Sequence, residues 1–136
     1  MNYIVNSMYG CDIYQEQTKS TYNASSISYI KLLCHEHLFT LEGYIKACKK
    51  IFKLKYKIPI YITENIQFIP TKSMRHIDVI WINYAQIKHF MSKKGGIMIV
   101  FKDETEICIE MSKNAWIKQI SKLDMIKSYK VKHFHS

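Results

Sequence analysis

The stretch from residue 57 to residue 83, KIPIYITENIQFIPTKSMRHIDVIWIN, carries the clearest strand signals in the chain. The isoleucines of KIPIYIT alternate with other residues at a period of two, which is typical of a strand with one buried face. A short turn leads into a second strand, IQFIP. The segment HIDVIWIN then predicts a third strand, with Ile77, Val79 and Trp81 on one face.

Residues 84–111 continue this sheet pattern toward the C-terminus. YAQIKHFM fits either a strand or a turn of helix, and we favour a strand. GGIMIVFK and TEICIEM flank Asp103 and Glu104, which predicts a hairpin between them. We therefore expect antiparallel strands throughout residues 57–111.

A pair of helices is predicted before these strands. Ser25 or Ser26 can cap a helix that runs to about Leu38. Thr40 can cap a second helix with a clear amphipathic stripe. That helix must end before Pro59, because the residue before a proline is pushed toward extended geometry.

The two ends of the chain complete the fold prediction. NYIVNSMYGCDIYQ predicts a strand broken near Gly10, and the polar KSTYNASSI that follows predicts a loop. Ser112 can cap a C-terminal helix, beyond which the tail is expected to fray. The order predicts an α+β protein, an antiparallel sheet with two helices from the N-terminal half and one C-terminal helix packed on one side. We expect one domain over residues 1–136, divided as 1–22, 25–53, 57–111 and 112–130.

Composition narrows the class of partner. The chain has 20 basic and 11 acidic residues, a net charge of +9, which favours a polyanionic partner such as DNA, RNA or an anionic membrane surface. No segment is apolar for as many as about 18 residues, so we expect no membrane span. The four cysteines show no CxxC spacing, which predicts free thiols and a cytoplasmic protein.

Lysines form a second stripe on the helix that begins at Thr40. Lys46, Lys49, Lys50 and Lys53 follow the spacing i, i+3, i+4, i+7, and residues 46–57 contain six lysines and no acid. A solvated helix face is one interpretation of this stripe. The other is a set of phosphate contacts, which give salt-sensitive affinity without reading base sequence.

The chain has nineteen lysines and a single arginine, Arg75. A guanidinium is planar and more weakly hydrated than an ammonium, which suits a narrow A·T minor groove or bidentate contact with guanine. We predict that Thr71, Lys72, Ser73 and Arg75 lie in or against a DNA groove. An ion pair between Arg75 and Asp78 is the structural alternative.

Nothing in the sequence predicts an enzyme. The chain lacks GxSxG, P-loop and GxGxxG motifs, and we expect no cofactor. Cys34 and His37 could share a metal on a helix, but two further ligands are missing, so we favour a core cysteine. The acidic cluster at Asp103, Glu104 and Glu106 is better interpreted as an exposed tip or partner contact.

The central stretch also resembles the signature of the ComK family, the competence transcription factors of Gram-positive bacteria. The matching residues are Lys57, Pro59 and Ile60, then Ile69, Pro70, Thr71, Ser73 and Arg75, then Trp81 and Ile82. Upstream, Cys34 and Gly43 keep the family spacing. Downstream, IMIVFKDETEICIEMS, Trp116 and Gln119 match its hairpin, serine cap and last helix. The resemblance covers about residues 25–125 and is that of a short, divergent member.

This resemblance implies a transcriptional activator that binds A+T-rich double-stranded DNA boxes largely through the minor groove. It also implies a homo-oligomer on DNA, located at the nucleoid, and control by a proteolytic adaptor. Two alternatives stay open. One is a protein-interaction module that pairs with a full-length relative or its adaptor. The other is a binder of single strands, which exposed tyrosines such as Tyr56 and Tyr61 could stack against.

Overall fold

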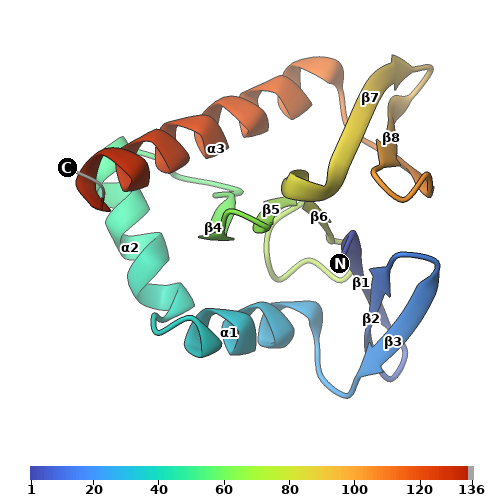
Figure 1. Cartoon of the computed structure of the whole chain (residues 1–136), viewed down its shortest axis with the longest axis horizontal. Coiled ribbons are helices and arrows are strands. Elements are labelled where there is room, and N and C mark those ends of the chain that lie inside the picture. Colours follow the sequence, from blue (N-terminus) through green and yellow to red (C-terminus); the bar gives the residue numbers. More distant parts are fainter. Residues whose placement is uncertain (135–136) are drawn as a thin grey trace.

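The computed structural model describes residues 1–134, and Figure 1 shows how their helices and strands are arranged. The α+β class is confirmed. The elements are β1 (Tyr3–Ser7), β2 (Gly10–Gln15), β3 (Thr18–Tyr22), α1 (Ser26–Glu36), α2 (Leu41–Phe52), β4 (Ile60–Thr63), β5 (Ile66–Pro70), β6 (Ile80–Asn83), the 3₁₀ turn η1 (Tyr84–Gln86), β7 (Ile87–Lys93), β8 (Gly96–Phe101), β9 (Glu106–Ile109) and α3 (Lys113–Phe134).

The strands form two antiparallel sheets, whereas the sequence led us to expect one. The larger sheet has the order β3-β2-β1-β6-β5-β4, and the smaller has the order β7-β8-β9. The division falls at η1, where the side chain of Asn83 accepts a hydrogen bond from the Ala85 amide at 3.2 Å and turns the chain out of the first sheet. Tyr3 of β1 stacks on Phe101 of β8 at 5.8 Å between ring centroids, which joins the two sheets.

Helices cover the larger sheet from both sides, so the expectation that they share one side is wrong. In Figure 1, α1 and α3 lie on opposite sides of β4, β5 and β6. The indole of Trp81 donates to the Ser26 hydroxyl at 3.2 Å on the α1 side. On the α3 side, Gln119 donates to the Lys57 carbonyl at 2.8 Å. Residues 67–70 of β5 are all buried, and a strand buried on both faces needs a covering layer on each.

The predicted helix starts are confirmed by their caps. The side chains of Ser25, Thr40 and Ser112 accept hydrogen bonds from amides three residues later, at 3.4, 3.0 and 3.1 Å. The second helix ends at Phe52, before Pro59 as predicted.

The C-terminal helix extends further than expected. It continues to Phe134, so the predicted fraying beyond about residue 130 is wrong over the described part, and residues 135–136 lie outside it. The ring of Tyr129 meets Phe52 of α2 edge-on at 5.3 Å and stacks on His133 at 3.9 Å. These contacts stabilise the last turns of the helix.

Two local predictions are corrected by the structure. The predicted loop after residue 18 begins with the edge strand β3, which pairs with β2 over its whole length. Its side chains are mostly exposed, so it lacks the apolar alternation that reveals a half-buried strand. Ile77 is 76% exposed and does not share a buried face with Val79 and Trp81, because residues 73–79 turn back on themselves before β6 begins.

Candidate nucleic-acid interface

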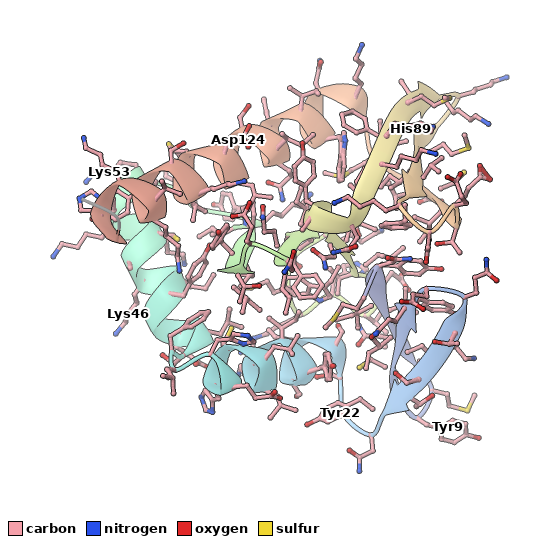
Figure 2. All side chains as sticks on the ribbon, viewed as in Figure 1. Tyr9, Tyr22, Lys46, Lys53, His89 and Asp124 are labelled. Atoms are coloured by element: carbon pink, nitrogen blue, oxygen red, sulfur yellow. The ribbon has the colours of Figure 1, made fainter. Side chains whose placement is uncertain are left out.

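The four predicted lysines of α2 lie on its exposed face. Figure 2 shows Lys46 and Lys53 on the outer side of the helix, pointing away from the rest of the molecule. Lys49 and Lys50 are exposed as well. Lys53 follows the last helical residue in the left-handed conformation, with φ of 58°.

The opposite face of α2 fixes the position of these lysines. Leu41, Tyr44 and Cys48 are buried at helical spacing. The Tyr44 hydroxyl donates to the Pro59 carbonyl at 2.7 Å and accepts from the Tyr61 amide at 3.0 Å. Burial raises the pKa of Tyr44, so its hydroxyl keeps its proton and the helix stays tied to the start of β4.

Sequence reasoning missed the continuation of this basic surface onto α3. Lys49, Lys53 and Lys55 surround a shallow hollow with Tyr56. The Tyr56 carbonyl accepts a hydrogen bond from the ammonium of Lys122 in α3 at 3.1 Å. Burial, and then the nearby charges of Lys57 and Lys118, lower the pKa of Lys122.

We define the basic strip as the lysines of α2, those of residues 53–57 that follow it, and Lys118 and Lys122 of α3. The i, i+4 spacing of Lys118 and Lys122 was visible in the sequence, but their packing beside residue 57 was not. None of the strip ammonium groups makes an ion pair with a carboxylate of the described residues. Its members are Lys46, Lys49, Lys50, Lys53, Lys55, Lys57, Lys118 and Lys122.

The segment that carries Arg75 is a loop held at its base, and we call residues 71–79 the Arg75 loop. At the base, the Thr71 amide donates to the Ile80 carbonyl at 3.0 Å, and the Thr71 hydroxyl accepts from the Ile80 amide at 2.9 Å. Thr71 is 6% exposed, and because its hydroxyl is bonded to the Ile80 amide, this side chain braces the base of the loop. Asn6 of β1 donates to the Ile77 carbonyl at 2.9 Å, which fixes the loop from the side.

Arg75 lies exposed within this loop. Asp78 does not pair with it, and no other carboxylate of residues 1–134 lies within ion-pair distance. Lys72 is partly exposed and Ser73 is exposed. The guanidinium is therefore free to contact a partner, which the alternative of an ion pair with Asp78 did not allow.

The basic strip and the Arg75 loop lie in different parts of the molecule. In Figure 1 the connection between β5 and β6 passes beside β1, whereas α2 lies at the left side of the molecule. The loop borders a cavity of about 440 Å³, which Lys72 and Asp78 of the loop line together with Glu110. Positive charge is therefore concentrated at the basic strip, whereas the Arg75 loop presents its arginine near both acidic and basic side chains.

Cys34 of α1 and His37, which follows the helix as its C-cap, are the residues that the sequence raised as possible metal ligands. All four cysteines are free, as predicted, and burial raises the pKa of the Cys34 thiol to about 11. His37 is exposed, and its Nδ1 lies 2.8 Å from the Leu33 carbonyl oxygen. Residues 1–134 contain no group of three or more side chains suited to holding a metal ion.

The acidic cluster has partners within the chain itself. Asp103 accepts hydrogen bonds from Asn2 at 2.9 Å and from the Thr105 amide at 3.0 Å, and Glu104 pairs with Lys88. The Thr105 bond closes the turn between β8 and β9, whereas Asn2 and Lys88 connect this turn to the start of the chain and to β7. Within the described part of the chain, no helix is both long and apolar enough to cross a membrane.

Fold and surface together define a small, basic α+β protein with a braced arginine loop and a row of lysines that form no ion pair within residues 1–134. The family model described as ComK protein matches residues 2–133, and the chain belongs to the ComK family. This is a family of competence transcription factors, and membership implies DNA binding. No curated protein and no solved structure matches the chain.

Proposed function

We propose that the protein is a transcription regulator that binds double-stranded DNA through the basic strip. The observation that carries the proposal is the row of ammonium groups that have no carboxylate partner among residues 1–134. Such groups can replace the counterions that are condensed on DNA, and the released counterions drive binding. The proposal needs no cofactor.

The Arg75 loop is the proposed reader of A+T-rich sequence. A narrow A·T minor groove has an enhanced negative potential that attracts arginine. Lys72, Ser73 and Arg75 would contact the groove, and Thr71 would hold the loop in shape. Its braced base supports this role, since a preorganised loop loses little entropy on binding.

The family resemblance extends the proposal to the role of the protein in the cell. We propose that the protein acts as an activator at the bacterial nucleoid in the cytoplasm. It would assemble as a homo-oligomer on A+T-rich boxes, and a proteolytic adaptor would control its amount.

Replacement of four strip lysines tests phosphate binding. We expect the combined variant Lys46→Gln, Lys49→Gln, Lys50→Gln and Lys53→Gln to bind all duplexes more weakly. The slope of log affinity against log salt should fall by about 0.9 for each lost phosphate contact, or roughly 3.6 for four. Fluorescence anisotropy with a labelled duplex at several salt concentrations measures this slope.

A matched variant separates local contacts from net charge. Lys93, Lys94, Lys102 and Lys113 are exposed and lie outside the strip. Their replacement by glutamine removes the same charge and should leave most of the slope unchanged. Equal losses in the two variants would contradict a phosphate-binding strip.

A further inference from the structure

A second surface feature lies on the face of α2 opposite the strip. A groove of about 610 Å³ runs between α2, the connection from α1 to α2, and the C-terminal half of α3. This volume lies within the range of small-molecule sites, roughly 300–1,000 Å³. The walls are mainly apolar and aromatic, and they include Phe39, Tyr44, Cys48, Phe52, Ile62 and Ile126.

One cation, Lys130 of α3, lies in this apolar groove. Its Nζ is 5.3 Å from the ring centroid of Phe39, 5.7 Å from that of Tyr44 and 5.4 Å from that of Tyr61. These distances allow cation–π attraction to all three rings. Burial lowers the pKa of Lys130, because removal from water disfavours the charged ammonium.

No carboxylate of the described residues pairs with Lys130. Two acids on neighbouring elements are already engaged. Glu42 pairs with Lys31 at 3.0 Å, and Glu64 pairs with Lys127 at 3.2 Å. A half-buried ammonium among aromatic rings therefore lacks the anion that would best stabilise it.

The groove is long and its rim is apolar. It follows α2 from Gly43 to Phe52, which corresponds to about 14 Å along a helix. Leu38 is 94% exposed and Ile51 is 46% exposed at the edge. An unbranched apolar chain fits this shape, because it can lie along the helix and cover these side chains.

We propose that the groove binds a medium-chain fatty acid, with its carboxylate against the Lys130 ammonium and its chain along α2. Charge complementarity selects a monoanionic head, and the apolar walls select the chain. This site is separate from the DNA-binding surface, and its existence does not depend on that proposal.

Titration calorimetry with decanoate, below its micelle concentration, tests the proposal on the full chain. We expect saturable binding of decanoate at one site and much weaker binding of decanol, which keeps the chain and lacks the charge. Lys130→Met should weaken decanoate binding by about 10- to 100-fold, the effect of losing a charged hydrogen bond. Lys130→Arg should retain most of the affinity.

Two controls make the result decisive. Lys132→Met removes an exposed charge from the same helix and should leave decanoate binding unchanged, and thermal melting verifies that each variant is folded. Equal binding of decanoate to wild-type protein and folded Lys130→Met would overturn the proposal, as would absence of binding. A wild-type dimer that Leu38→Glu dissociates would also overturn it, because a second copy would then cover the groove.

Discussion

Arg75 is the side chain on which sequence preference depends in our proposal. It is exposed, it forms no ion pair within residues 1–134, and the loop that carries it is braced by Thr71 and Asn6. Lysine supplies the same charge but is more strongly hydrated, so it enters a narrow minor groove less readily. The shape of the ion should therefore matter at this position as well as its charge.

Replacement of Arg75 tests this expectation. We predict that Arg75→Lys keeps nearly all affinity for a G+C-rich duplex while its preference for A+T-rich duplex falls, by roughly 1–3 kcal/mol for one lost specific contact. Competition between labelled A+T-rich and unlabelled G+C-rich duplexes measures the preference. Lys72→Arg is the control and should keep it, so an unchanged preference in Arg75→Lys would argue against groove reading.

Single residues differ in how far the sequence could predict them. The exposure of Arg75 followed from its place between two predicted strands. The burial of Thr71 did not, because threonine is common both on surfaces and as a bonded group at a loop base. Ile77 misled the prediction, since an apolar residue two positions before Val79 fits a strand pattern even where the backbone turns away.

At the scale of elements, α2 combines a surface role with a structural one. Its lysines are exposed on one face, and Tyr44 on the other face makes two buried hydrogen bonds to the chain around β4. The amphipathic period and the Thr40 cap predicted both faces. The bonds of Tyr44 could not be predicted, because they connect residues that only tertiary packing brings together.

Removal of the Tyr44 hydroxyl tests the structural role. Tyr44→Phe leaves the Tyr61 amide and the Pro59 carbonyl without a partner, which should lower the free energy of unfolding by about 1–3 kcal/mol. Urea denaturation followed by circular dichroism measures the change. Tyr56→Phe should have little effect because Tyr56 is 77% exposed, and equal stabilities of the two variants would show that the Tyr44 bonds contribute nothing.

Among the strands, those with buried faces were predictable and the polar edge was not. β4, β5 and β8 carry apolar side chains that mark them in the sequence. β3 has the polar sequence TKSTY, and its pairing with β2 depends on the short turn between the two strands. The covering of both faces of the large sheet could not be predicted either. Alternation of apolar residues indicates that one face of a strand is buried, but it does not indicate which element covers that face.

At the scale of the whole molecule, net charge predicted the kind of partner but not the shape of the surface. The charge of +9 pointed to a polyanion. Only the fold shows that α3 adds Lys118 and Lys122 to the lysines of α2. The separation of the basic strip from the Arg75 loop is also a property of the fold, and in our proposal affinity and sequence preference therefore belong to different elements.

The central claim is that this basic α+β protein binds double-stranded DNA with a preference for A+T-rich sequence. The most direct test is a titration of the wild-type protein against an A+T-rich palindromic duplex and a scrambled G+C-rich duplex at several salt concentrations. The proposal predicts tighter binding to the A+T-rich duplex, and affinities for both that fall steeply as salt rises. Equal affinity for the two duplexes, or no duplex binding at physiological salt, would contradict it.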